Sequence, residues 1–133
     1  MSLDINLIAV FAAAIATFLF GALWYSPLLF LEAWAKEAAI NTDQNLGSPV
    51  RVFGLTFLST LFSSAMLSLV LYHETTAWFG ALKGAGVGAF FVMASLGINY
   101  QFAQCSFKQW LIDGGFHVGR FAIMGFIIGG WLY

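Results

Sequence analysis

Three ionisable residues stand close together in the last apolar segment of the chain: Asp113, His117 and Arg120. Spacings of four and then three residues place them on one face of a helix, because side chains one turn apart are neighbours there. A single Asp or Arg at the centre of a membrane helix costs roughly 2.5–3.5 kcal/mol on insertion scales. A stripe of three therefore cannot face lipid. We expect it to face other helices, a partner subunit or a water-filled cavity.

This stripe could do ion or proton chemistry, since ionisable residues inside a membrane commonly mark transport pathways or ligand sites. Asp113 would accept the ion or proton, His117 would be its proton-sensitive partner and could hydrogen-bond to it, and Arg120 would be the counter-charge or contact an anion. A second hypothesis is a neutralised structural network that joins helices and binds no ligand. A third is a contact between subunits. The residues alone leave all three open.

Polar side chains near the ends of two other apolar segments could reach this stripe. Trp and Tyr at a helix end are more commonly interface anchors, and a Pro there more commonly ends the helix. The alternative is that the chain breaks at Pro27 and exposes backbone carbonyls to a ligand, as broken helices do in transporters. The candidates for the polar site are Asp113, His117, Arg120, Asn99, Gln104, Trp24, Tyr25 and Ser26.

Four long apolar segments must position these residues, and about 20 residues suffice to cross the hydrocarbon core. Pro27 is expected to kink or end the first helix. The segment after it mixes apolar and charged side chains, which is typical of a short helix lying in the membrane interface. We predict one all-α membrane domain over residues 1–133, with transmembrane helices at about 5–27, 52–72, 78–102 and 110–132 and an interfacial helix at about 28–40.

The composition supports a membrane protein and excludes several other classes. The chain has 133 residues, of which 61% are hydrophobic and 8% charged, whereas a soluble domain has about a quarter charged. A net charge of −1 leaves no basic face for nucleic acid. Cys105 is the lone cysteine, and His73 beside Glu74 provides too few ligands for zinc. We expect no metal, no cofactor and no nucleic-acid partner, and the first segment is expected to be a permanent span.

Small residues recur along two of the predicted helices. Gly80, Gly84 and Gly88 follow one another at intervals of four, and Gly115 and Gly119 repeat the spacing in the last helix. Such stripes let membrane helices approach closely. We expect helix packing within one bundle. A glycine-lined permeation path and a cleft for a lipid remain alternatives.

The distribution of Lys and Arg predicts an orientation in the membrane. With four spans, both termini share a side with the second loop, where Lys83 is the one basic side chain. The opposite side carries Lys36, Arg51 and Lys108. Because cytoplasmic loops carry an excess of basic residues, we expect loops one and three to be cytoplasmic and both termini to lie outside.

Two segments resemble a known family. Residues 21–30, Gly-Ala-Leu-Trp-Tyr-Ser-Pro-Leu-Leu-Phe, with Trp34 and Lys36 after them, are similar to the opening motif of a family of small bacterial membrane proteins of unknown function. Residues 111–117, Leu-Ile-Asp-Gly-Gly-Phe-His, resemble its second motif. The chain departs from that pattern at Leu31-Glu32 and at Phe116. The resemblance implies four membrane helices in a bacterial inner membrane, and it implies no activity.

Two functional hypotheses follow. In the first, the protein is a small transporter, channel or ligand-binding bundle in the lipid bilayer, assembled as a homo-oligomer because four helices enclose little volume, and its ligand is a small molecule or ion. In the second, it is a structural or accessory membrane protein whose glycine-rich faces bind partner helices. No enzyme motif such as a Gly-x-Ser-x-Gly elbow or a phosphate-binding loop is present, so an enzyme is the less favoured class.

Overall fold

The structure is a computed structural model that describes residues 5–39, 48–73 and 76–131. Residues 40 and 132, which end two of the predicted segments, and Glu74 of the predicted loop pair lie outside this part of the chain. The described residues form helices and connecting turns, with no strand among them. The helical segments are α1 (Leu7–Trp24), α2 (Leu31–Ala38), α3 (Pro49–Val70), α4 (Ala77–Val87), the π-helix η1 (Gly88–Met93), α5 (Ala94–Phe102) and α6 (Phe107–Gly130).

Four of these helices are long and apolar enough to cross a membrane, counting α4, η1 and α5 as one continuous helix over Ala77–Phe102. The prediction of an all-α membrane fold with four such helices is therefore confirmed, and the short α2 follows the first of them as expected. Local chemistry sets several helix ends. Asn6 and Ser106 accept backbone N–H groups at the starts of α1 and α6, and Pro49 stands in the first turn of α3.

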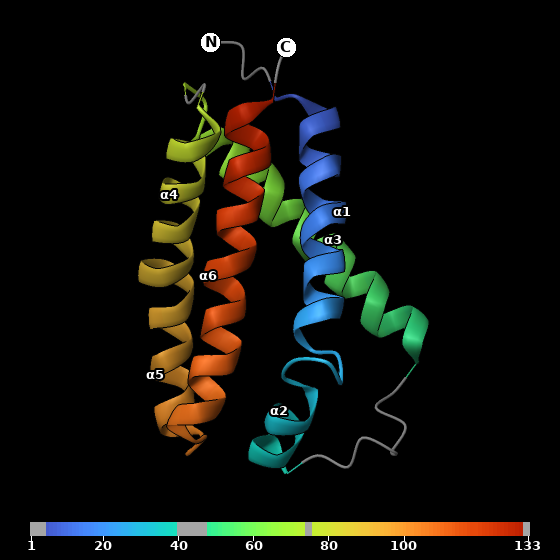
Figure 1. Ribbon diagram of the computed structural model, residues 1–133, viewed down its shortest axis with the longest axis vertical. Coiled ribbons are helices and arrows are strands. Elements are labelled where there is room, and N and C mark those ends of the chain that lie inside the picture. Colours follow the sequence, from blue (N-terminus) through green and yellow to red (C-terminus); the bar gives the residue numbers. More distant parts are fainter. Residues whose placement is uncertain (1–4, 40–47, 74–75, 132–133) are drawn as a thin grey trace.

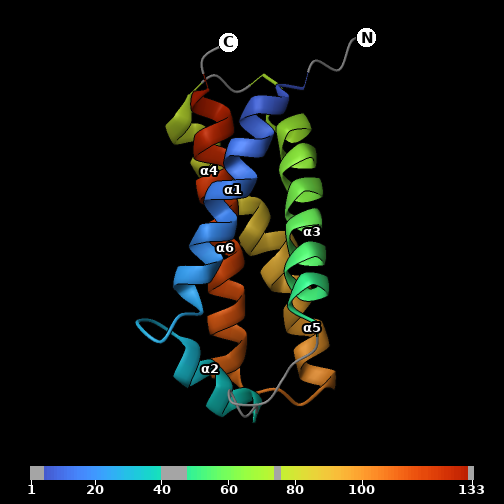
Figure 2. The ribbon, with the colours of Figure 1, turned by 90° about the vertical axis from the view of Figure 1, so that its right-hand side faces the viewer.

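Helix α6 lies at the centre of the bundle. The α4–η1–α5 helix packs along one side of it and α1 along the other, while α3 packs mainly on α1 (Figure 1). Figures 1 and 2 together show that α3 crosses its neighbours obliquely, so that its first turns lie apart from α5. The start of α1, the end of α3, the start of α4 and the end of α6 share one end of the bundle (Figure 1). Helix α2 and the connection from α5 to α6 share the other.

Glycines allow α4 and α6 to approach almost backbone to backbone. A Cβ atom added at Gly80 would collide with the carbonyl oxygen of Gly125, and one added at Gly84 would collide with that of Phe121. At Gly88 the added atom would come within 2.7 Å of the His117 carbonyl oxygen. The Gly80, Gly84 and Gly88 stripe thus faces α6 inside the bundle.

Two other glycines of α6 receive side chains from α1. Gly115 lies against the Trp24 ring and Gly119 against the Phe20 ring, both from α1. The apolar core lies nearer the end where α6 finishes, and its buried members are Ala13, Leu67, Leu71, Phe121, Met124 and Ile128. Asp113 lies toward the start of α6, outside this apolar core.

Candidate functional site

Asp113 is the centre of a hydrogen-bonded cluster about two turns into α6. Its side chain is only 7% exposed. The Tyr25 hydroxyl donates to one carboxylate oxygen at 2.5 Å, and the Tyr100 hydroxyl donates to the other at 2.5 Å. A buried carboxylate needs such donors, because leaving it unpaired in an apolar interior is very costly. Asp113 therefore joins the end of α1, α5 and α6.

Aromatic side chains from the end of α1 surround this cluster. The indole N–H of Trp24 donates to the Ile112 carbonyl at 3.0 Å, so the residue before Asp113 is also bonded to the first helix. The Tyr25 ring packs edge-on against Phe116 and against Trp34 of α2. Trp24 and Tyr25 thus connect the end of α1 to α6.

The position of Tyr100 depends on the π-helix. In an uninterrupted α-helix, the face that carries Gly84 and Gly88 would continue to Asn99, because residues seven and eleven apart share a face. The π-helix adds one residue to a turn and shifts the face by one position. Met93 then meets Gly114, and Gly97 meets Trp110. Tyr100 follows on the same face and reaches Asp113. At the end of the π-helix, the Met93 carbonyl accepts the Trp110 indole N–H at 2.9 Å.

His117 and Arg120 form a second polar cluster, one turn further along α6. The Arg120 Nε–H donates to His117 Nδ1 at 3.0 Å, and Arg120 Nη2 donates to the Ser63 hydroxyl of α3 at 3.3 Å. Because His117 Nδ1 accepts a hydrogen bond, its ring proton belongs on Nε2 and the imidazole is neutral. His117 is therefore tied to Arg120, while the two tyrosines hold Asp113.

The Arg120 guanidinium is only partly satisfied. Its Nη1 is buried and has no hydrogen-bond partner among the described residues. The guanidinium carbon lies 4.4 Å from the centre of the Phe121 ring, which gives a favourable cation–π contact. A buried cation without a carboxylate partner is a costly arrangement. Arg120 is thus the least stabilised charge of the two clusters.

The structure brings some of the predicted site residues together and leaves others apart. Asp113, Tyr25 and Trp24 meet in one cluster, and His117 with Arg120 forms the other. Asn99 and Gln104 are exposed, and Ser26 donates to the Leu23 carbonyl of its own helix turn. The sequence reasoning missed Tyr100, because a regular α-helix was assumed through residues 88–93. Ser63 of α3 is the other residue that sequence reasoning missed, because no sequence signal pairs it with Arg120.

A cavity of about 440 Å³ opens between α1, α3 and α6 next to the Asp113 cluster. Its wall combines aromatic rings with hydroxyl groups, and Tyr25 belongs both to this wall and to the hydrogen bond with Asp113. The residues that line the cavity are Thr17, Phe18, Gly21, Ala22, Tyr25, Val52, Phe53, Thr56, Thr60 and Phe116.

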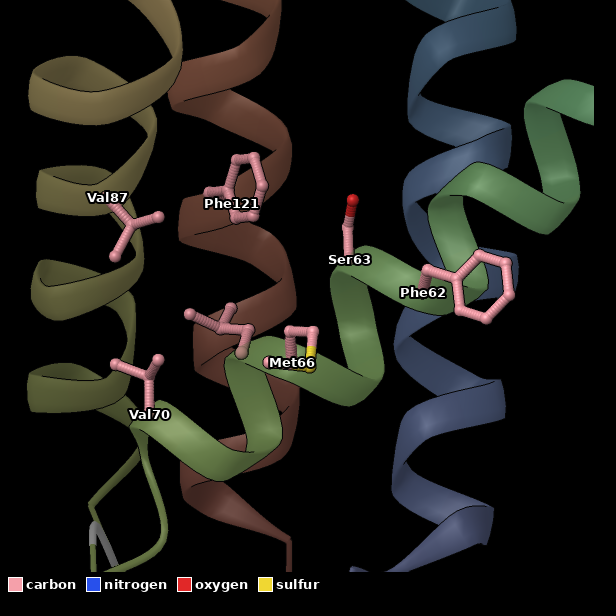
Figure 3. Close-up of a pocket in the computed structure, with 7 residues that line it drawn as sticks. Phe62, Ser63, Met66, Val70, Val87 and Phe121 are labelled. Atoms are coloured by element: carbon pink, nitrogen blue, oxygen red, sulfur yellow. The ribbon is translucent and has the colours of Figure 1, made fainter.

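A second, more open pocket of about 350 Å³ lies between α3, α4 and α6 (Figure 3). Figure 3 shows Val70, Met66, Ser63 and Phe62 in succession along α3, with Val87 and Phe121 contributed by the two other helices. Ser63 is its one polar lining side chain, and its hydroxyl already accepts from Arg120. This pocket is therefore an apolar recess over the Arg120 cluster.

No group of three or more His, Cys, Asp or Glu side chains converges on a metal-sized space within the described residues. Over residues 8–129 the chain matches the family described as "Protein of unknown function (DUF1761)". Because the match covers most of its length, the chain belongs to this family. No curated protein and no solved structure is detectably similar to it.

Proposed function

We propose that this member of the DUF1761 family is a ligand-binding membrane bundle of the small transporter or channel type. Its ligand occupies the cavity between α1, α3 and α6. The observation that carries the proposal is Tyr25, whose ring lines this cavity and whose hydroxyl donates to the buried Asp113. A cavity with a few polar groups among apolar and aromatic walls is the usual form of a small-molecule site.

The geometry favours this proposal over an accessory role. An accessory protein that binds partners through Gly80, Gly84 and Gly88 would have to present that stripe to the bilayer. The stripe instead packs against α6, where Gly80 and Gly84 meet backbone atoms. Those glycines are used within the bundle, so they support no partner surface.

The proposal includes location and assembly. The protein resides in a bacterial inner membrane with its α2 end in the cytoplasm, and it assembles as a homo-oligomer. The cytoplasmic orientation of the α2 end is supported by the basic residues there. They are Lys36 in α2, Arg51 in the first turn of α3 and Lys108 in the first turn of α6. The mass of the purified protein in detergent, measured by light scattering, tests the assembly.

The experiment that tests the function measures whether water reaches the cavity in a membrane. In a Cys105→Ser background, Thr56→Cys places a thiol on the cavity wall, and Leu58→Cys places one on the same helix outside the cavity lining. A charged, water-soluble thiol reagent should modify Thr56→Cys in membrane vesicles and leave Leu58→Cys unmodified. If the two thiols react equally slowly, the cavity is dry and the proposed function is wrong.

A further inference from the structure

We infer that the cavity between α1, α3 and α6 selects an organic cation with an apolar body. This inference rests on the proposed function, since it specifies the ligand of the same cavity. Three features of the lining carry it: the use of every side-chain hydrogen-bond donor, the aromatic walls and the position of the charges.

Each side-chain donor that lines the cavity is already committed to an acceptor within the protein. Thr17 donates to the Ala13 carbonyl at 2.8 Å, and Thr56 donates to the Val52 carbonyl at 2.7 Å. Thr60 donates to the Thr56 carbonyl at 2.8 Å, in the same manner. The Tyr25 hydroxyl donates to Asp113. An anion needs free donors, and these side chains offer it none. Their oxygens keep only lone pairs, which suit a ligand of positive charge.

Aromatic rings supply the other part of the wall. Phe18 and Phe53 form an edge-to-face pair between α1 and α3, with ring centres 6.2 Å apart. Tyr25 and Phe116 form a second pair between α1 and α6, with ring centres 5.3 Å apart. The faces of such rings carry negative potential and attract a weakly hydrated cation, and each contact contributes roughly 0.5–2 kcal/mol. Apolar parts of the ligand pack on the same rings.

The charges of Asp113 and Arg120 are held by different side chains. Asp113 lies directly behind Tyr25, so its negative charge is one hydrogen bond from the cavity. Arg120 is held by Ser63 and lies over Phe121, and both of these residues line the other pocket. His117 accepts the Arg120 Nε–H and is neutral. The charge that is hydrogen-bonded directly to a side chain of the cavity wall is therefore a carboxylate.

The ligand is an organic cation and not a metal ion. The oxygens on the wall belong to three threonines and one tyrosine, and no carboxylate lines the cavity. Divalent ions prefer carboxylate and carbonyl oxygens in numbers that this wall does not supply. A volume of about 440 Å³ with aromatic walls fits a drug-sized or smaller organic ion.

Two ions of the same shape and opposite charge test this inference. Binding of tetraphenylphosphonium and of tetraphenylborate to the protein in lipid nanodiscs is measured by equilibrium dialysis, with empty nanodiscs subtracted. Tetraphenylphosphonium should bind saturably, and tetraphenylborate should not. Asp113→Asn should weaken cation binding about tenfold by removing the charge behind Tyr25.

Because Asp113 also joins three helices, a second pair of variants keeps the test independent of folding. Phe53 and Phe62 lie on α3 with exposed fractions of 59% and 65%, but only Phe53 lines this cavity. Phe53→Leu should weaken cation binding about fivefold through the lost ring, whereas Phe62→Leu should leave it unchanged.

Equal binding of both ions, or equal effects of the two Leu variants, would overturn the inference. If the inference fails in this way but Thr56→Cys reacts with the thiol reagent, the proposed function remains and the ligand belongs to another class. An unreactive Thr56→Cys would remove the proposed function itself.

Discussion

Asp113 and Arg120 lie seven residues apart on α6, yet their surroundings give them opposite energetic roles. Asp113 is held by two phenol donors from two other segments, Tyr25 and Tyr100. Hydrogen bonds to a charged group contribute about 1.5–3 kcal/mol each. Asp113→Asn keeps the shape but loses the charge and half of the acceptor capacity. We expect it to lower the unfolding free energy by about 2 kcal/mol.

Thermal unfolding in detergent measures this loss, with Asn99→Ala as the control. Asn99 is exposed on α5, one residue from Tyr100, and its removal should change stability little. If Asp113→Asn were as stable as Asn99→Ala, the carboxylate would contribute nothing to helix association.

Arg120 should behave in the opposite way. Its guanidinium carries a desolvation cost of several kcal/mol, and Nη1 recovers none of it through hydrogen bonding. Arg120→Met fills a similar volume without the charge, so we expect the melting temperature to stay constant or rise, despite the lost bonds to His117 and Ser63. Arg51→Met, at an exposed position in α3, is the control. A clear drop for Arg120→Met alone would mean that the guanidinium is a structural element.

At the residue level, the sequence was sufficient to find the stripe on α6 and its aromatic neighbours at the end of α1. Helical spacing alone places Asp113, His117 and Arg120 on one face, and that spacing survives in the structure because α6 is regular. The division of the stripe into two clusters was not predictable. It depends on which donors arrive from α1, α3 and α5, and single-helix periodicity contains no information on crossing angles.

At the scale of elements, the closest contact in the bundle is that of α4 with α6, and one pair of glycines tests it. A Cβ atom at Gly84 would collide with the Phe121 carbonyl, whereas one at Gly86 has nothing within 4 Å. Gly84→Ala should therefore force the helices apart and cost about 1–3 kcal/mol, as overpacking does. Gly86→Ala should be neutral or slightly stabilising, since Ala is the better helix former. Equal melting temperatures would contradict this close packing.

The third apolar helix shows where prediction by period fails. The length of this helix, its apolar character and its glycine stripe can be predicted from the sequence, because each depends on local residues. The π-helix over residues 88–93 was not, since nothing in the run Gly-Ala-Phe-Phe-Val-Met marks an extra residue per turn. That single residue moves the inward position from Asn99 to Tyr100 and so decides the partner of Asp113.

At the scale of the whole molecule, the arrangement makes the membrane orientation testable at two sites. Helix α2 and the starts of α3 and α6 gather Lys36, Arg51 and Lys108 at one end, while Lys83 lies in the second turn of α4, nearer the other (Figure 1). Basic residues are retained in the cytoplasm during insertion. The α2 end should therefore face the cytoplasm in the intact cell.

Two single-cysteine variants in a Cys105→Ser background report the two ends. Glu32→Cys is exposed in α2, and His73→Cys is exposed just after α3 at the opposite end. In spheroplasts, a membrane-impermeant maleimide should label His73→Cys at once and Glu32→Cys only after lysis, because the bilayer separates the reagent from the cytoplasmic end. The reverse order would place the basic end outside. Labelling of both variants before lysis would indicate that the protein inserts in both orientations. A three-to-one excess of basic residues at one end would then be too weak to set a single orientation.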